Sequence, residues 1–165
     1  RRVGGYYSET EFDLTRLQLL RESMVEIGRS CIDPDYRTGG TIALLWSGLA
    51  NFMTQGGYRT LIGCASIGMA DGGHLAANLY RRLGEHMAPP EYRVFPRHPL
   101  PVEQLFNGQP AELPPLIKGY LRAGAYVGGE PAWDPDFNTA DLLIMMPMAR
   151  VEERYARHFL ERKAA

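Results

Sequence analysis

Short, nearly continuous apolar runs recur along the chain and predict buried strands. The clearest runs cover residues 24–32, 60–66 and 141–146, and a shorter one covers residues 125–128. Such runs are typical of strands that helices cover on both faces. Because a helical segment separates the first two runs, we expect these two strands to be parallel.

Between these runs, apolar residues recur at three- and four-residue spacing, which predicts helices. A long helix is expected over residues 41–55, before a glycine pair, and a second over residues 73–87, before a proline pair. Shorter helices are expected over residues 14–20, 114–122 and 150–162. The alternation of strands and helices predicts an α/β layered sandwich.

Composition and charge narrow the class of protein. The chain has 165 residues, of which 45% are hydrophobic and 22% charged, and its formal net charge is −1. A chain of this size buries one core, so we expect a single domain over residues 1–165. The charge offers no overall positive field to nucleic acid, and no apolar run approaches the roughly 18 residues of a membrane span. We therefore expect neither a nucleic-acid partner nor a membrane-spanning segment.

The cysteine and histidine residues predict neither a disulfide nor a metal site. Cys31 and Cys64 each lie within a predicted strand, so we expect core residues without a disulfide and a cytoplasmic location. The four histidines have no metal-ligand spacing, and no metal site is predicted.

The segment of residues 25–42 joins a predicted strand, a glycine-containing turn and the start of the long helix. Backbone N–H groups and the positive end of a helix dipole point outward in such an arrangement, which favours a bound phosphate. Gly39 and Gly40 allow a close backbone approach, and Arg37 adds positive charge. An ordinary glycine turn is the alternative interpretation.

Three blocks of sequence carry a family resemblance. They are residues 6–14 (YYSETEFDL), residues 26–37 (EIGRSCIDPDYR), and residues 114–122 (PPLIKGYLR) continuing to 131–141 (PAWDPDFNTAD). In order and spacing they resemble the ornithine-acyl-carrier-protein N-acyltransferases of the GNAT superfamily, relatives of the acyl-homoserine lactone synthases. The resemblance implies a GNAT-like mixed β-sheet flanked by helices, with the N-terminal strands of that fold missing from this sequence.

The resemblance also implies a reaction. A long, often 3-hydroxylated acyl chain would pass from the phosphopantetheine thioester of acyl carrier protein to the α-amine of ornithine, the first step of ornithine lipid biosynthesis. Such an acyltransferase has acyl carrier protein or coenzyme A as its donor and no permanently bound cofactor. Another amine acceptor, or a non-catalytic acyl-carrier-binding module, stays open as an alternative.

Amine attack on a thioester needs a neutral amine and a polarised carbonyl. Glu26 is the candidate proton acceptor, with a structural salt bridge to Arg29 as the alternative. Arg29 and Ser30 follow on the same predicted strand, and simple alternation places Arg29 on the opposite face from Glu26 and Ser30. A bulge in the strand would bring all three side chains to the site. The resemblance to GNAT domains implies such a bulge at this position. Without it, Arg29 is a packing residue or binds the acceptor carboxylate.

The donor phosphate is expected on the loop at the start of the long helix, formed by Arg37, Thr38, Gly39, Gly40 and Thr41. This loop departs from the superfamily pattern at Ile42, where a small residue is usual.

Acidic residues are the candidates for the cationic acceptor. Glu11 and Asp13 precede the first strand, and a solvated acidic loop is the alternative for both. Asp141 is the preferred candidate, because it stands at the entrance of a predicted strand. Surface arginines could meet an acidic carrier protein or anionic lipid, so we also consider peripheral contact with the inner face of the membrane.

Overall fold

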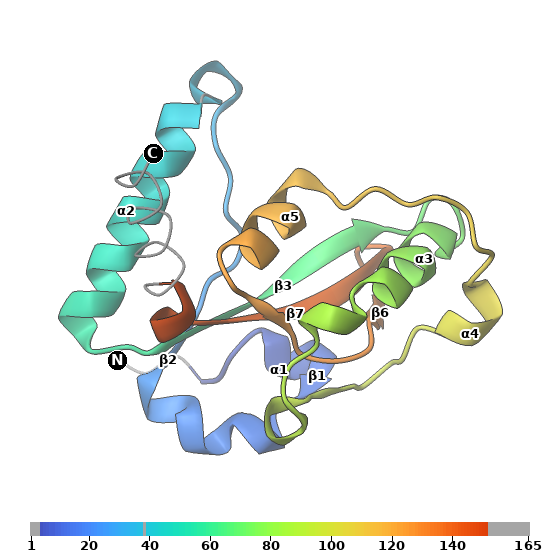
Figure 1. Cartoon of the computed structure of the whole chain (residues 1–165), viewed down its shortest axis with the longest axis horizontal. Coiled ribbons are helices and arrows are strands. Elements are labelled where there is room, and N and C mark those ends of the chain that lie inside the picture. Colours follow the sequence, from blue (N-terminus) through green and yellow to red (C-terminus); the bar gives the residue numbers. More distant parts are fainter. Residues whose placement is uncertain (1–3, 38, 152–165) are drawn as a thin grey trace, which may run out of the picture.

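A long antiparallel pair of strands forms the centre of the computed structural model, which describes residues 4–37 and 39–151 (Figure 1). The two strands, β3 (Thr60–Gly68) and β7 (Thr139–Pro147), pair along their whole length. The sheet is completed by β2 (Met24–Glu26), parallel to β3, and by β5 (Tyr126–Val127) and β6 (Ala132–Asp134), both antiparallel to β7. The predicted parallel pairing of the first two strands is confirmed.

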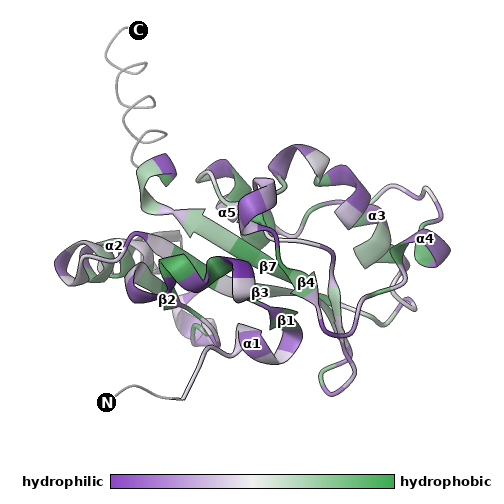
Figure 2. Cartoon of the chain, turned by 90° about the horizontal axis from the view of Figure 1, so that it is seen from below, coloured by the Kyte–Doolittle hydropathy of each residue, from purple (hydrophilic) through white to green (hydrophobic). Residues whose placement is uncertain are grey.

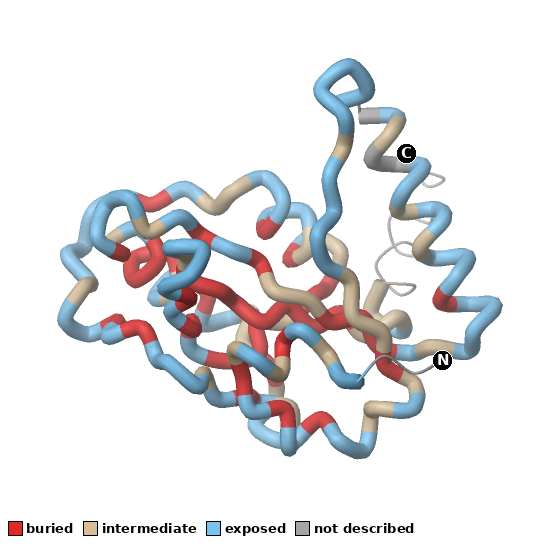
Figure 3. Tube along the Cα trace, turned by 180° about the vertical axis from the view of Figure 1, so that it is seen from behind, coloured by how far each residue is buried: buried red, intermediate tan, exposed pale blue. Residues whose placement is uncertain are grey.

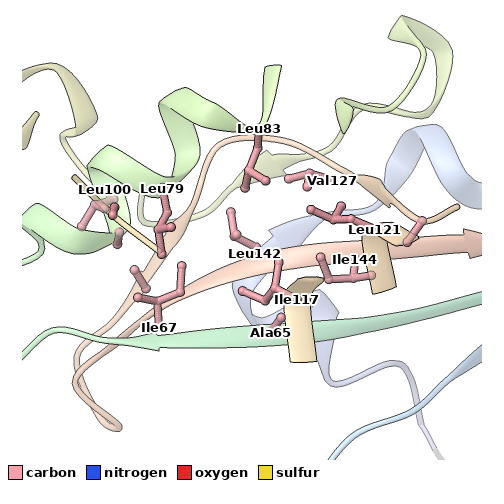
Figure 4. Packing of buried hydrophobic residues seen from close by; sticks show 14 of the residues in the cluster. Ala65, Ile67, Leu79, Leu83, Leu100, Ile117, Leu121, Val127, Leu142 and Ile144 are labelled. Atoms are coloured by element: carbon pink, nitrogen blue, oxygen red, sulfur yellow. The ribbon is translucent and has the colours of Figure 1, made fainter. Parts of the chain in front are cut away.

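Helices α3 (His74–Arg82) and α5 (Pro115–Arg122) cover one face of this sheet. Figure 4 shows side chains of the two helices, and of Leu83 directly after α3, meeting side chains of β3 and β7. They are Leu79, Leu83, Ile117, Leu121, Ala65, Ile67, Leu142 and Ile144. The apolar residues that predicted these two helices thus contribute to their buried faces. Figure 2 shows hydrophobic residues concentrated along the central strands, with mixed surfaces on the helices.

The other face of the sheet packs against the N-terminal segment. Its elements are α1 (Ser8–Glu11), β1 (Phe12–Asp13) and the 3-10 helix η1 (Thr15–Ser23). Phe12 and Leu17 are fully buried there beside Ile62 and Met145. The short helix expected over residues 14–20 is therefore present, in the tighter 3-10 form.

Short elements occupy the turns and the long proline-rich connection. They are η2 (Pro34–Tyr36), η3 (Gly84–His86), η4 (Pro90–Tyr92), β4 (Phe95–Pro96), which pairs with β1, and α4 (Val102–Leu105). The helix expected over residues 73–87 ends at Arg82, and η3 follows as a separate turn.

The long helix expected over residues 41–55 is confirmed as α2 (Gly39–Gly56), which stands at one end of the molecule (Figure 1). Met53 is buried, but Leu44 and Phe52 are 74% and 53% exposed. Figure 3 shows that the chain leading into α2 is also exposed. The apolar stripe of α2 is therefore only partly covered by the described part of the chain.

The strand expected over residues 24–32 is wrong beyond Glu26. The Ile27 N–H still donates to the Ile62 carbonyl, 2.9 Å away, and the chain then leaves the sheet. Arg29 has a φ of 53°, a left-handed backbone conformation that a regular strand does not contain. Cys31 lies on this departing segment and is exposed, so its expected place in the core is wrong.

The C-terminal helix is expected over residues 150–162, and all of this range after residue 151 lies outside the described part of the chain. Residues 148–151 are helical. Within the described ranges, no helix combines the length and the apolarity that a membrane crossing requires.

Candidate active site

The parallel strands β2 and β3 separate at Ile27, and we call this place the fork. Gly63 of β3 lies opposite, and a Cβ on Gly63 would come within 2.4 Å of the Ile27 carbonyl oxygen. Only glycine permits this close approach of the two backbones. After Ile27 the chain turns away through Gly28 and Arg29. The ladder of β2 with β3 ends at Glu26, so the two segments diverge from there.

Glu26 is the last residue of β2 and is held by the start of α1. Its carboxylate accepts hydrogen bonds from the Tyr7 N–H (2.5 Å), the Ser8 N–H (2.7 Å) and the Ser8 hydroxyl (2.5 Å). These donors use three of the roughly four acceptor positions of a carboxylate. Within the described residues Glu26 forms no ion pair with Arg29, whose side chain is exposed.

A cavity of about 680 Å³ opens beside Glu26 on the α1 face of the sheet, and we call it the polar cavity. Its lining consists of Gly5, Tyr7, Glu26, Ile27, Gly28, Arg29, Cys64, Ser66, Asp134, Phe137, Thr139 and Asp141. Three residues predicted from the sequence, Glu26, Arg29 and Asp141, thus border one cavity. Ser30, Glu11 and Asp13 are not part of its described lining.

Asp141 is the more deeply buried of two buried carboxylates in the polar cavity, the other being Asp134. Asp141 lies in β7, is 2% exposed, and accepts a hydrogen bond from the Thr139 hydroxyl at 3.0 Å. Burial raises the pKa of Asp141 above its ordinary value, and hydrogen bonds from Ser66 and Thr139 oppose this effect. A cation that replaced the lost water would stabilise the charged carboxylate.

Asp134 serves the local backbone instead. Its carboxylate accepts the N–H groups of Asp136 and Phe137, at 2.9 and 3.0 Å, and so closes the turn between β6 and β7. Its charge nevertheless adds to that of the nearby acids. Burial raises the pKa of Tyr7 to about 12, and the charges of Asp134, Glu11 and Asp141 contribute to the rise.

Glu11 and Asp13 have different environments. Burial raises the pKa of Glu11, with smaller contributions from the charges of Asp134 and Asp141. Asp13 is exposed, and its pKa is lowered first by a hydrogen bond with the Thr15 side chain and then by one from the Thr15 N–H, 2.8 Å away. Glu11 therefore belongs to the negative surroundings of the polar cavity, whereas Asp13 ends the turn before η1.

The predicted phosphate loop lies at the N-terminus of α2. Gly39, Gly40 and Thr41 are in its first turn, at the positive end of the helix dipole. The Arg37 side chain is exposed and donates from Nε to the Ile32 carbonyl at 3.0 Å. Thr38 lies outside the described residues.

Sequence patterns missed the partners of Glu26 and the half-buried Cys64. Cys64 lies on β3, 3.4 Å from the Ser8 hydroxyl, and burial raises the pKa of its thiol to about 12. This thiol is therefore protonated at neutral pH and is a poor nucleophile. Ser8 stands within the first sequence block, but its contact with Glu26 depends on packing between distant segments.

Comparison with known proteins shows what this chain is similar to. Residues 1–47 match the model of the acetyltransferase (GNAT) domain. The L-ornithine N(alpha)-acyltransferase of Rhodobacter capsulatus is 32% identical over 97% of this chain and 64% of its own length. The corresponding proteins of Brucella abortus and Agrobacterium fabrum are 33% and 35% identical, in each case over 94% of this chain.

The chain spans 64%, 59% and 56% of these three relatives. No solved structure matches it. The similarity nevertheless extends over nearly the whole chain. The chain is thus similar to L-ornithine N(alpha)-acyltransferases, and its first 47 residues match a GNAT acetyltransferase domain.

Proposed function

We propose that the protein transfers an acyl chain from a phosphopantetheine thioester to the α-amine of ornithine, the first step of ornithine lipid biosynthesis. The observation that carries the proposal is the charge pattern of the polar cavity. Carboxylates Glu26 and Asp141 and the guanidinium of Arg29 border this one cavity beside the fork. Ornithine carries two ammonium groups and one carboxylate, so its charges complement those of the cavity.

In this proposal the acceptor binds with its carboxylate near Arg29 and its side-chain ammonium near Asp141. The buried carboxylate of Asp141 would then gain a counter-ion, and the α-amine would point toward the fork. Holding the amine next to the thioester carbonyl lowers the entropic part of the barrier.

Glu26 is the proposed proton acceptor. The α-ammonium gives one proton to the Glu26 carboxylate, directly or through a water molecule, and the neutral amine nitrogen attacks the thioester carbonyl carbon. The C–N bond forms, the C–S bond breaks, and the leaving thiolate takes up the second proton, which the nitrogen loses as it becomes an amide. Three hydrogen bonds already fix the carboxylate, so its remaining acceptor position has a defined direction.

The donor would bind with its phosphate at Arg37, Thr38, Gly39, Gly40 and Thr41. The N-terminus of the 18-residue helix α2 supports an anion site there. Acyl carrier protein is the proposed partner, with acyl-coenzyme A as the alternative donor. A cytoplasmic location with peripheral contact to the inner face of the membrane fits a reaction whose product is a lipid.

Turnover tests the proposal directly. The full-length protein is incubated with ornithine and 3-hydroxypalmitoyl-acyl carrier protein, and free thiol and acyl-ornithine are measured by a thiol reagent and by mass spectrometry. We expect equal amounts of both products. Absence of thiol release between about pH 6 and 9, a range that brackets the ordinary pKa of an α-amino group, would sink the proposal.

The same assay separates the alternatives. Faster reaction with a short-chain acyl-coenzyme A, or with an amine other than ornithine, would assign a different acyl transfer to this site. Tight binding of the acyl donor without thiol release would favour a non-catalytic acyl-carrier-binding module.

A further inference from the structure

In the described part of the chain, one edge of the central strand β3 has no pairing partner beyond the fork, and we call it the open edge. The last bond between the two strands runs from the Ile27 N–H to the Ile62 carbonyl, 2.9 Å away. The N–H and C=O of one strand residue point to the same edge, and this edge alternates from residue to residue. Cys64, Ser66 and Gly68 therefore direct these groups as Ile62 does, toward the open edge.

The bonds on the other side of β3 agree with this assignment. The Gly128 N–H donates to the Leu143 carbonyl at 2.7 Å, so Leu143 directs its polar groups away from β3. Its neighbour Leu142 therefore directs its own toward β3, where its register partner is Ala65. The odd-numbered residues of β3 thus pair with β7, and the even-numbered residues beyond Ile62 are left for the open edge.

The open edge forms one wall of the polar cavity. Cys64 and Ser66 belong to the lining of this cavity, and so do Gly28 and Arg29 of the segment that leaves the sheet. The cavity thus lies where β2 would have continued, and Arg29, with its left-handed φ of 53°, does not take the place of a paired residue. Ser66 is exposed and lies opposite Asp141 in the register of β3 and β7. Unpaired N–H and C=O groups on a strand edge are a template for the main chain of another molecule.

The main-chain groups of a free amino acid match this template. In a parallel ladder, one residue donates its N–H to a carbonyl of the neighbouring strand and accepts the N–H that lies two residues later. On the open edge these two groups are the Cys64 carbonyl and the Ser66 N–H. A single Cα separates the α-ammonium and the α-carboxylate of an amino acid, just as it separates the N–H and C=O of one residue.

We propose that the open edge binds the acceptor amino acid by its main-chain groups, with the α-ammonium on the Cys64 carbonyl and the α-carboxylate on the Ser66 N–H. The α-amine is then held at the end of the edge that is nearer the fork. The carboxylate shares the cavity with the guanidinium of Arg29, and a side chain that crosses Ser66 ends at Asp141. The inference rests on the proposed acyl transfer for the identity of the acceptor, and it explains why the α-amine and not the side-chain amine meets the thioester.

The surroundings of Cys64 support this orientation. Its Sγ lies 3.4 Å from the Ser8 hydroxyl, which donates to the Glu26 carboxylate at 2.5 Å. Cys64 and the proposed proton acceptor thus share one neighbour. An ammonium group has three N–H donors, so it can bond the Cys64 carbonyl and Glu26 at once. The amide nitrogen of the product keeps one N–H, which remains available to the Cys64 carbonyl.

Ser66→Pro removes the N–H that this proposal requires. Proline is tolerated on a strand edge when its missing N–H would point away from the paired strand. Ser66→Ala is the control for the lost hydroxyl, because it keeps the N–H. Gly68→Pro is the matched control for the proline ring, because Gly68 directs its N–H to the same edge but is not part of the described cavity lining.

The first experiment measures binding without catalysis. L-Ornithine and 1,4-diaminobutane, which lacks the carboxylate, are titrated by calorimetry into the full-length protein without an acyl donor, and circular dichroism verifies that each variant folds. We expect Ser66→Pro to weaken L-ornithine binding about ten- to hundredfold, the effect of one hydrogen bond to a charged group, and to leave 1,4-diaminobutane unchanged. Ser66→Ala should affect both ligands alike, and Gly68→Pro neither. Equal losses for the two ligands in Ser66→Pro would overturn the proposal.

Amide hydrogen exchange, followed by NMR in the unaltered full-length protein, tests the open edge without a variant. In the free protein the Cys64 and Ser66 amides should exchange faster than those of Gly63 and Ala65, which point toward β7. L-Ornithine at about 100 times its Kd should slow the Ser66 amide up to about 100-fold, and 1,4-diaminobutane should not. A Ser66 amide that already exchanges slowly in the free protein would mean that another segment pairs with this edge, and would overturn the proposal.

The open-edge site and the proposed acyl transfer fail separately. Selective protection of the Ser66 amide by L-ornithine without thiol release would keep the site and refute the acyl transfer. Thiol release with a Ser66 amide that L-ornithine does not protect would refute the open-edge site alone.

Discussion

Glu26 shows how one side chain combines anchoring with proposed chemistry. In the unaltered protein, the Tyr7 and Ser8 N–H groups donate to the two carboxylate oxygens of Glu26. In Glu26→Gln an NH2 group replaces one of these oxygens, so at least one N–H loses its acceptor. We expect a loss of about 1–3 kcal/mol in the free energy of unfolding, measured with urea. We also expect thiol release to fall roughly 10²- to 10⁴-fold, the usual contribution of a general base.

Ser8→Ala separates the two effects. It removes one of the three hydrogen bonds to Glu26 and leaves the carboxylate in place. The expected cost in stability is about 0.5–1.5 kcal/mol, with a much smaller fall in thiol release than in Glu26→Gln. Equal losses of turnover in the two variants would show that Glu26 acts by anchoring α1 and not by accepting a proton.

Because the pKa of Asp141 is raised in the folded protein, we expect the free energy of unfolding to depend on pH. Burial raises its pKa in the folded protein, so the folded state binds the proton more tightly than the unfolded chain does. The stabilising contribution of the protonated carboxyl is complete below the ordinary value of 3.8 and is lost as the pH rises through the raised pKa. Asp141→Asn has no proton to lose. Its unfolding free energy relative to the unaltered protein should therefore increase across this window and then level off.

Urea unfolding at a series of pH values from about 3.5 to 8 measures this difference, and a constant offset between the two proteins would contradict the assigned cause. Thr139→Val is the matched control. It removes the hydroxyl that donates to Asp141 and should raise the pKa further, widening the pH window.

At the residue scale, the sequence predicted Glu26, Arg29 and Asp141 but not their surroundings. These three residues stand out because charge is unusual next to strand-like apolar runs. Tyr7 and Ser8 approach Glu26 across 19 and 18 positions of the chain, and no local periodicity encodes such contacts. The separate roles of Asp134 and Asp141 likewise depend on burial and turn geometry.

At the scale of elements, apolar patterns predicted β3, β7, α3 and α5 well, because these elements supply the buried core. The pattern failed at residues 27–32. The apolar content of that segment is typical of a strand, yet its backbone departs at Ile27 to form the fork. Where a strand leaves its neighbour depends on close backbone approach at Gly63 and on Arg29, and hydropathy reports neither.

Gly63 therefore offers a test of the fork as an element. In Gly63→Ala the new Cβ would lie 2.4 Å from the Ile27 carbonyl oxygen, so the backbones must move apart. We expect a loss of about 1–3 kcal/mol in unfolding free energy, typical of overpacking. Gly68→Ala is the control on the same strand, since its Cβ meets nothing within 4 Å, and a change within about 0.5 kcal/mol is expected. Equal effects in urea unfolding would mean that the close approach at the fork is relaxed in solution.

At the scale of the whole molecule, the sheet separates two environments. The polar cavity faces α1, and an apolar cavity of about 750 Å³ lies on the other face, between α2 and α5. Helix α2 contributes both the proposed phosphate site at its N-terminus and one wall of the apolar cavity. Since Met53 is the buried side chain among those described on α2, this helix is held less firmly than the central strands.

Hydrogen exchange tests this division of stability. Amides that β3 and β7 direct toward each other should exchange slowest, and amides of α2 should exchange faster through local opening. The exchange rates are measured by mass spectrometry. Equal exchange in α2 and in the central strands would mean that α2 is held as firmly as they are.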